Sequence, residues 1–470
     1  MKAKDLYIND EFQIKGQWFL PNQEEKAIGG ILYYSSNGIR LELQDVFAGN
    51  GSLNRFSYVL GNCEDNLQVT LIDGFEVNRK TSIIQTSKIS FNQMIIGDHY
   101  RIDDEVKFHQ IDYKYTYLEE WFDDNPFNIE TPDSPDKHLY TIKYNKPKES
   151  FRIKVNSVGA TVEGGSYNNT IHDQKAPKIS HENCIKIKPT DGETKSIHWF
   201  NEVEEKVRNL LAFLMNRPVF KTQIIAKGRY GDYGVKHRKD IYIYSFYGVD
   251  IQPKKIHPSE VFISLKDVID DLEHIVNLWF DEKLTKPIGN YIRNIYGGNG
   301  ETVDNFLRYT KVFESFHRET VDDAVYVTEK EYKKIRRKMI NSIDDMVTDE
   351  FKVKLRNDLI RSYQYEFRKQ IKYYLENIND NLKEQILSDK NIDEMVQRII
   401  RTRNHYTHYG DKQKGVIEEG FELLYVNVLL KTVAFYWIAK KLSFSNQYLE
   451  RIIKDDYNLG YRLEKARNIF

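Results

Sequence analysis

The sequence predicts an α+β multidomain protein, in which a β-rich first part, folded as a sandwich or an irregular barrel, precedes an all-α helical bundle. Over most of residues 1–262, apolar and polar residues alternate with period two, as in strands that bury one face. From residue 263 onwards, apolar residues recur about every 3.6 positions, as they do on helices. We therefore expect a β-rich domain over residues 1–262, a joining amphipathic helix and linker over residues 263–300, and a helical domain over residues 301–470.

The β-rich part is expected to begin with a hairpin. Ile39, Leu41 and Leu43 alternate with polar residues, and Asn37-Gly38 before them is a strong signal for a two-residue turn, so this strand should pair with residues 31–34. One helix should interrupt the strands, because apolar residues recur at helical spacing over residues 200–214. Further short strands are expected at residues 67–72, 106–117, 139–144, 151–155, 184–187 and 241–246.

The helical part should begin with an apolar stripe formed by Leu265, Val268, Ile269, Leu272, Ile275, Val276 and Trp279, which defines the joining helix. The bundle itself should contain a first helix lined by aromatic residues from Phe306 to Phe316, a long helical region to about residue 387, a helix from Ile392, and an apolar helix over residues 416–442. Residues 421–439 are the most apolar stretch, but the polar side chains within it favour a buried bundle helix over a membrane span.

The composition gives no sign of a secreted, disulfide-bonded or metal-cluster protein. The chain has 470 residues and a formal net charge of −1, which does not by itself indicate a nucleic-acid partner. Its two cysteines, Cys63 and Cys184, form neither a disulfide framework nor a metal cluster, and this usage fits a reducing compartment. The N-terminus lacks the apolar core of a signal peptide. We expect a cytoplasmic protein that needs no metal and no cofactor.

The main chemical motif lies at the end of the predicted helix that starts at Ile392. It contains Arg403, Asn404 and His408. Arginine can hold a phosphate through a permanent forked charge, and histidine can exchange a proton near neutral pH. Spacing alone leaves alternatives open, because Arg398–His405 and Arg401–His408 are similar pairs. A helix end whose arginine and histidine side chains only cap the last carbonyls is a further interpretation.

The second half of the chain resembles a HEPN domain. That family is an all-α bundle whose signature is an arginine, often followed by asparagine, and then a histidine after four to six residues. Arg403-Asn404-x-x-x-His408 matches it with four intervening residues, and the Arg-Asn pair selects Arg403 over the other arginines. The predicted first bundle helix, with Glu314 and His317-Arg318, resembles the helix that opens many such bundles.

The first half resembles the N-terminal domain of ApeA proteins. Residues 30–43 are similar to its first hairpin, and residues 117–122 are similar to another recurrent segment. A β-rich half, a joining helix and a C-terminal HEPN bundle make up the architecture of the ApeA abortive-infection proteins of bacterial phage defence. The resemblance therefore extends over nearly the whole chain.

This resemblance implies a metal-independent endoribonuclease that cleaves host RNA. It assigns catalytic roles to Arg403 and His408 and a supporting role to Asn404, and Glu314 and His317 are possible supporting residues. It also implies RNA as substrate. Because a nuclease that acts on host RNA must be controlled, we expect an activating trigger derived from phage or from damage, and the polar residues within 421–439 predict that no membrane is involved. The β-rich half would be the sensor of that trigger.

The spacing of the motif raises a geometric problem. Residues five apart on a regular helix lie about 140° apart around the axis, so Arg403 and His408 do not share a face. Either the helix unwinds near Thr407, or two copies of the chain pool their motifs across a two-fold interface. The family resemblance favours a homodimer formed through the helical bundle.

Two other classes of function fit the same sequence. The protein could be a non-catalytic RNA-binding or sensing module that uses Arg403 for phosphate contact, although binding alone does not require His408. It could also be a carbohydrate- or protein-binding β-domain with a helical oligomerisation tail. Incubation with total RNA, followed by a search for fragments that end in cyclic phosphate, separates these possibilities from an endoribonuclease.

Overall fold

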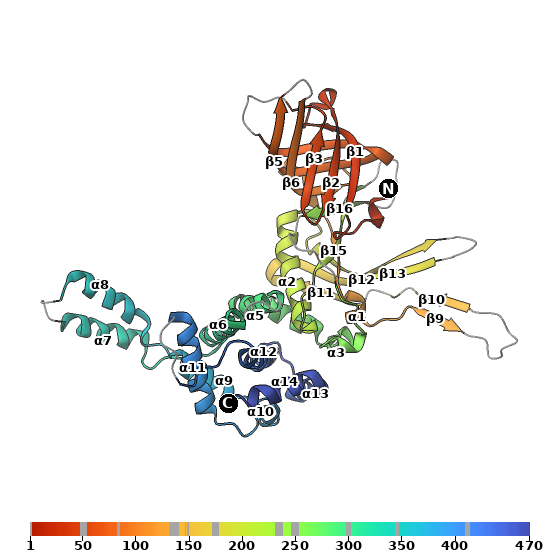
Figure 1. Ribbon diagram of the computed structural model, residues 1–470. Coiled ribbons are helices and arrows are strands. Elements are labelled where there is room, and N and C mark those ends of the chain that lie inside the picture. The colour runs from red at the N-terminus through yellow and green to blue at the C-terminus, as the bar shows by residue number, and fades with distance from the viewer. Residues whose placement is uncertain are drawn as a thin grey trace. The chain divides into compact units, whose positions relative to one another are not determined.

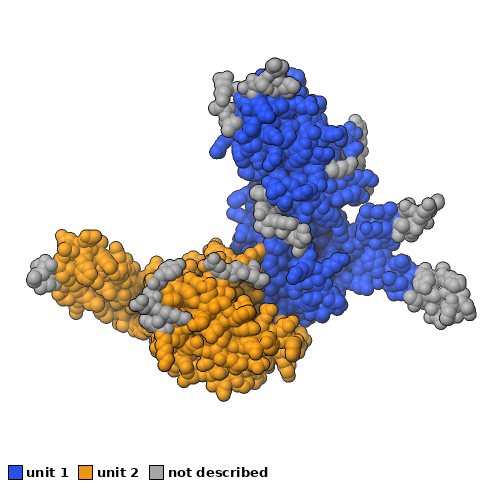
Figure 2. Space-filling model, in the orientation of Figure 1, with its two compact units in different colours: residues 1–276 blue, residues 277–470 orange. Residues whose placement is uncertain are grey.

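The chain forms two compact units in a computed structural model, residues 1–276 and residues 277–470 (Figure 2). The first unit is built mainly from antiparallel strands and the second from helices, so the predicted fold class is confirmed. The structure describes residues 2–47, 54–81, 85–130, 141–145, 147, 150–171, 178–230, 238–245, 253–297, 302–322, 324–343, 347–408 and 414–470.

Six antiparallel strands of the first unit close into a barrel (Figure 1). Their hydrogen-bonded order is β6-β3-β2-β1-β4-β5, and β5 also pairs with β6, which completes the ring. A closed barrel has no exposed strand edge. The strands are β1 (Phe12–Phe19), β2 (Ile28–Ser35), β3 (Gly38–Leu43), β4 (Arg55–Cys63), β5 (Leu67–Thr81) and β6 (Gln85–Ile96).

The barrel is filled by the inward-facing residues of these strands. Trp18 is fully buried among side chains that include Leu32 and Leu41. Gly61 on the neighbouring strand β4 makes room for this indole, since a Cβ at that position would lie 2.4 Å from the Trp18 ring. The period-two pattern of the sequence therefore corresponds to a packed barrel interior.

The predicted first hairpin is confirmed, with a shift at its turn. Strands β2 and β3 pair so that Tyr34 faces Ile39 and Ser35 faces Gly38. The two turn residues are therefore Ser36 and Asn37 rather than Asn37-Gly38. This register places Ile39, like Leu41 and Leu43, on the buried face, which the alternation of the sequence demands.

A second set of strands continues from the barrel through the C-terminal end of β6, which pairs with β16. From there the order is β16-β15-β8-β13-β12-β11. Two-stranded pairs β9–β10 and β7–β14 accompany it. The bounds are β7 (Lys107–Phe108), β8 (Ile111–Tyr115), β9 (Phe127–Glu130), β10 (Thr141–Tyr144), β11 (Arg152–Val155), β12 (Ala160–Ile171), β13 (Lys178–Pro189), β14 (Lys195–Ser196), β15 (Lys221–Tyr230) and β16 (Arg238–Ser245).

Four helices complete the first unit: α1 (Leu118–Phe122), α2 (Ile197–Met215), α3 (Leu265–Val268) and α4 (Leu272–Trp279), the last of which crosses the unit boundary. The predicted helix over residues 200–214 is confirmed as α2, whose Leu211 and Leu214 share an apolar core with Trp121 and Ile185. The predicted joining helix is two short helices instead of one. Ile269, between them, is 38% exposed, whereas the other residues of its stripe are buried.

The second unit is an all-α bundle with α12 at its centre. This helix is buried along most of its length and packs on α5, α6, α9 and α14. The helices are α5 (Thr285–Tyr296), α6 (Thr302–Thr320), α7 (Glu329–Asn341), α8 (Asp349–Asp358), α9 (Phe367–Glu376), α10 (Asp380–Leu387), α11 (Ile392–His408), α12 (Phe421–Lys441), α13 (Asn446–Asp455) and α14 (Tyr457–Arg467).

Two predicted helices have different bounds in the structure. The long region to residue 387 is divided into α8, α9 and α10, because side chains such as Thr348 and Asn379 cap new helix starts within it. The apolar helix begins at Phe421 rather than residue 416. Among the described residues, α12 is the one helix long and apolar enough to cross a membrane, and it forms the core of the bundle.

Candidate active site

The motif residues lie at the C-terminal end of α11. Asn391 caps the N-terminus of this helix, since its side-chain oxygen accepts hydrogen bonds from the backbone N–H groups of Asp393 and Glu394. Met395, Val396 and Ile399 are buried, and α11 packs on α6 and α9. This packing fixes the position of the last turn, which carries the motif.

The three arginines of the motif region have different partners. Arg398 donates to the carbonyl oxygens of Gly415 and Ile469, and Arg401 donates to the carbonyl oxygen of Lys414 at 2.9 Å. These two side chains therefore hold the chain that follows α11 and the C-terminus. Arg403 instead contacts residues of two other helices of the bundle.

Arg403 is held by a carboxylate and an aromatic ring. Its Nη2 atom donates to Oε1 of Glu314 on α6 at 2.7 Å, and its guanidinium lies 5.1 Å from the ring centre of Phe367 on α9. The side chain remains 32% exposed, so the guanidinium is fixed in orientation and still open to solvent. A charged group held in this way can receive a phosphate without a large loss of side-chain entropy.

Asn404 and His408 are both exposed to solvent. His405 is half-buried, and its ring lies 5.0 Å from that of Tyr406, whose hydroxyl donates to the carbonyl oxygen of Ile417. The structure therefore brings Arg403 and Glu314 together and leaves His408 on the surface.

The helix is continuous through His408. Arg403 and His408 consequently lie about 140° apart around its axis. The unwinding near Thr407 that would bring them to one face is not present in this helix.

His317 lies in the core, one turn after Glu314 on α6. It is 1% exposed, and its ring contacts the rings of Tyr365, Tyr373 and Tyr374. Burial, together with the positive charges of Arg318 and Lys369, lowers the pKa of His317 to about 4. The imidazole is therefore neutral at pH 7.

Sequence reasoning missed Phe367, because no local pattern connects the start of α9 with a residue on α11. It also gave no sign of a cluster of potential metal ligands. In the part of the chain that the structure describes, such a group is formed by Glu119, Asp124 and His181 of the first unit, and not by residues of the motif.

Glu314→Gln tests the positioning of Arg403. If this site cleaves RNA, loss of the ion pair should lower kcat/KM by roughly tenfold to a hundredfold, because a displaced guanidinium meets the phosphate less often in the right geometry. The free energy of unfolding should change by less than about 1 kcal/mol, since the pair is partly exposed.

Glu319→Gln is the matched control for this variant. Glu319 lies on the same helix and pairs with Lys286 at 3.4 Å, away from the motif. Equal loss of activity in both variants, or no loss in Glu314→Gln, would contradict a positioning role for Glu314.

Two family models match the chain. One, the ApeA N-terminal domain 1, matches residues 13–279, and the other, an Apea-like HEPN domain, matches residues 307–448. Neither the curated proteins nor the solved structures contain a match. The first matched region covers the barrel and its attached sheet, and the second covers the helices that carry Glu314, Arg403 and His408.

Proposed function

The chain belongs to the family of ApeA proteins with a C-terminal HEPN domain, and from this premise we propose that it is a metal-independent endoribonuclease that cleaves host RNA in abortive infection. The HEPN domain indicates a ribonuclease-type function in defence. The observation that carries the proposal is the exposed end of α11, where Arg403 is held by Glu314 beside Asn404 and His408.

The chemistry needs two kinds of group. His408 takes the proton from the ribose 2′-hydroxyl, or gives a proton to the leaving 5′-oxygen. Arg403 stabilises the extra negative charge on the pentavalent phosphate. The new 2′-oxygen–phosphorus bond replaces the 5′-oxygen–phosphorus bond, and the products are a cyclic phosphate and a free 5′-hydroxyl. Asn404 holds a phosphate oxygen or orients the histidine.

The contacts of the other arginines support Arg403 as the catalytic one. Arg398 and Arg401 are engaged by backbone carbonyls of their own chain. If these two side chains turned toward a phosphate, the protein would lose the hydrogen bonds that hold the segment after α11. Arg403 instead donates to a carboxylate, and a phosphate can share the guanidinium with this carboxylate or replace it.

We propose that the active form is a homodimer with a composite site. Because α11 is regular to its last residue, one copy cannot present Arg403 and His408 on the same face. A two-fold partner can supply the second residue. Exposed apolar side chains on the bundle, among them Phe421 at 79% and Leu424 at 45%, are suited to an interface.

In this proposal the β-rich unit senses a trigger derived from phage or from damage. The motivation is that a nuclease acting on host RNA requires control, and the unit of residues 1–276 is large enough to provide it. A cleavage assay with lysates of infected and uninfected cells tests this role. Equal cleavage with both lysates would argue against it.

RNA cleavage should persist in excess EDTA, and DNA of the same sequence should stay intact. The proposed nucleophile is the 2′-hydroxyl, which DNA lacks, and the proposed acid–base and charge-stabilising groups are side chains. Purified protein with labelled RNA or DNA, with and without EDTA, gives the measurement, and RNA fragments should end in cyclic phosphate. A strict requirement for Mg²⁺, or equal cutting of DNA, would refute the mechanism, and RNA binding without any cleavage would favour the non-catalytic alternative.

A further inference from the structure

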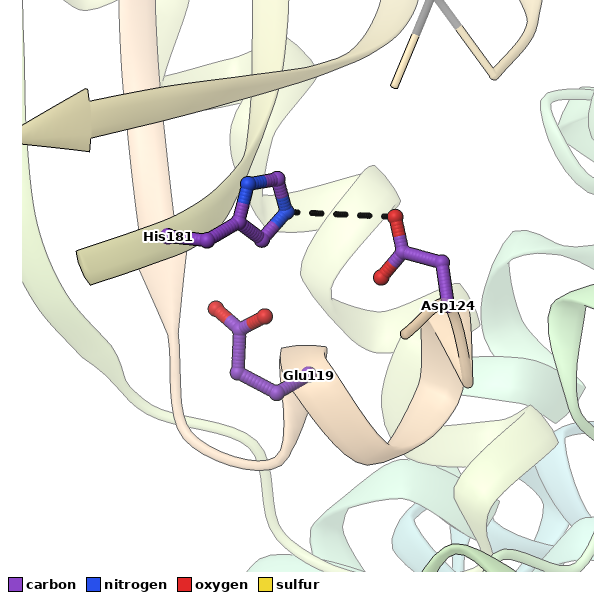
Figure 3. Close-up of side chains that lie close together, drawn as sticks. All are labelled: Glu119, Asp124 and His181. Atoms are coloured by element: carbon purple, nitrogen blue, oxygen red, sulfur yellow. Dashed lines mark ion pairs between the residues drawn. The ribbon is translucent and has the colours of Figure 1, made fainter. Parts of the chain in front are cut away.

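Three side chains of the first unit form a group that the proposed ribonuclease chemistry does not use. Glu119 lies on α1, Asp124 is the second residue after this helix, and His181 lies on β13. One ligand atom from each lies within 4.8 Å of the others. Figure 3 shows the two carboxylates and the imidazole directed toward a common region.

Asn183 brings the two carboxylates together. Its backbone N–H and its Nδ2 atom each donate to one oxygen of Glu119 at 2.7 Å, and Nδ2 also donates to Oδ1 of Asp124 at 2.9 Å. Asn183 is 2% exposed and lies two positions after His181, so both point to the same face of β13. One buried amide therefore fixes two anionic groups in close proximity.

The negative charge of this pair is poorly compensated. Within the described part of the chain, the ion-pair partner of these carboxylates is His181, whose Nε2 atom lies 3.8 Å from Oδ2 of Asp124. Two carboxylates held this close repel each other when both are ionised. A cation placed between the groups would relieve this repulsion.

One oxygen of Asp124 points to the place where such a cation would lie. Oδ2 is buried and accepts no hydrogen bond from any described residue. Its distance of 3.8 Å from Nε2 of His181 is too long for a hydrogen bond. A cation bound about 2.1 Å from each atom would span such a gap.

Tyr144 lies where it can position the imidazole of His181 for a metal ion. The side chain is 3% exposed, and Nδ1 lies 3.0 Å from the hydroxyl of Tyr144 on β10. In the structure Nε2–H donates to Oδ1 of Asn183, so the hydroxyl of Tyr144 donates to Nδ1. A bound metal ion would replace the proton on Nε2, and Nδ1–H would then donate to the hydroxyl of Tyr144. Metal-binding histidines commonly have such a donor contact on the second nitrogen, which fixes the tautomer and the ring.

We propose that Glu119, Asp124 and His181 bind a divalent first-row transition-metal ion, with Tyr144 as the residue that positions the imidazole. An imidazole combined with carboxylates suits Zn²⁺ or Mn²⁺ better than Mg²⁺ or Ca²⁺, which prefer oxygen ligands alone. Oδ1 of Asn183, 3.2 Å from Nε2 of His181, is close enough to become a fourth ligand after a small shift. Glu119 is exposed to solvent, which gives the ion a way in.

The ion would join parts of the first unit that are distant in sequence. It would link α1 and Asp124 to β13, and through Tyr144 also to the β9–β10 pair. The site thus stabilises the segment that contains residues 117–122 within the β-rich unit. This inference does not depend on the ribonuclease activity, and its test measures metal binding rather than RNA cleavage.

The experiment uses the full chain, treated with a chelator, desalted, and titrated separately with Zn²⁺, Mn²⁺ and Mg²⁺ by calorimetry. We expect one Zn²⁺ per chain, weaker Mn²⁺ binding, negligible Mg²⁺ binding, and a Tm that rises with Zn²⁺. His181→Ala and Asp124→Asn should lower Zn²⁺ affinity by at least about a hundredfold, and Tyr144→Phe by roughly tenfold to a hundredfold.

His198→Ala is the matched control, because His198 is an exposed histidine of the same unit that pairs with Glu202. It should bind Zn²⁺ as the unaltered chain does. The proposal is overturned if the unaltered chain binds no Zn²⁺ and shows no change in Tm, or if His198→Ala loses as much affinity as His181→Ala. Should a ligand variant fail to fold, the titration and the Tm of the unaltered chain decide the question.

Discussion

Replacement of Arg403 or of His408 by alanine is expected to abolish RNA cleavage while the chain stays folded. Each change should lower the rate by at least about a hundredfold, since one removes the charge that stabilises the pentavalent phosphate and the other removes the group that transfers the proton. The fold should persist because His408 is exposed and the ion pair of Arg403 is partly exposed. Single-turnover cleavage of labelled RNA and circular dichroism give the two measurements.

His405→Ala and Arg401→Ala are the controls for these variants. His405 is a near neighbour of His408, and Arg401 donates to the carbonyl oxygen of Lys414. Their effect on the chemical step should be small. An inactive His405→Ala variant together with an active His408→Ala variant would mean that the site pairs His405 with Arg398 or Arg401.

A mixture of the two inactive variants is expected to recover activity. If each site takes Arg403 from one copy and His408 from its partner, a mixed dimer contains one complete site and one site that lacks both groups. Equal amounts of Arg403→Ala and His408→Ala chains, unfolded and refolded together or co-expressed, should then reach about a quarter of the unaltered activity. The measurement is the cleavage rate at equal total protein.

This mixing experiment distinguishes a composite site from a site within one copy. With both groups acting from the same chain, no mixture of the two variants contains a complete site, and the rate stays at the background of the separate variants. The control mixes either single variant with the double variant Arg403→Ala/His408→Ala. No dimer in that mixture contains a complete site. Sedimentation of a fully active monomer would also exclude the composite site.

The sequence by itself determined the class of each half and the place of a candidate motif. Alternation with period two in residues 31–43 corresponds to β2 and β3, and the helical spacing of residues 200–214 corresponds to α2. These patterns are local, because a strand or helix with one buried face imposes its own period on neighbouring residues. Arg403, Asn404 and His408 could be named because they lie within six residues of one another and match the family signature, and their roles stay a prediction.

Local pattern was weaker at element ends. The turn of the first hairpin moved by one residue, and the long helical region to residue 387 was divided into α8, α9 and α10. The start of a helix depends on single side chains such as Thr348, which caps α8. Packing decides whether such a residue begins a new helix or lies inside a longer one. The predicted stripe of Leu265 to Trp279 was divided in the same way into α3 and α4.

Only the tertiary structure decided which residues meet. Closure of the barrel depends on pairing between β5 and β6, and the contact of Arg403 with Glu314 joins residues 89 positions apart. The group of Glu119, Asp124 and His181 likewise depends on the packing of α1 on β13. Burial of His317, which makes it neutral at pH 7, follows from its packing against Tyr373 and Tyr374 on α9 and Tyr365 just before that helix. Such contacts are set by how apolar faces pack in three dimensions, and a one-dimensional period specifies which face is buried but not its partner.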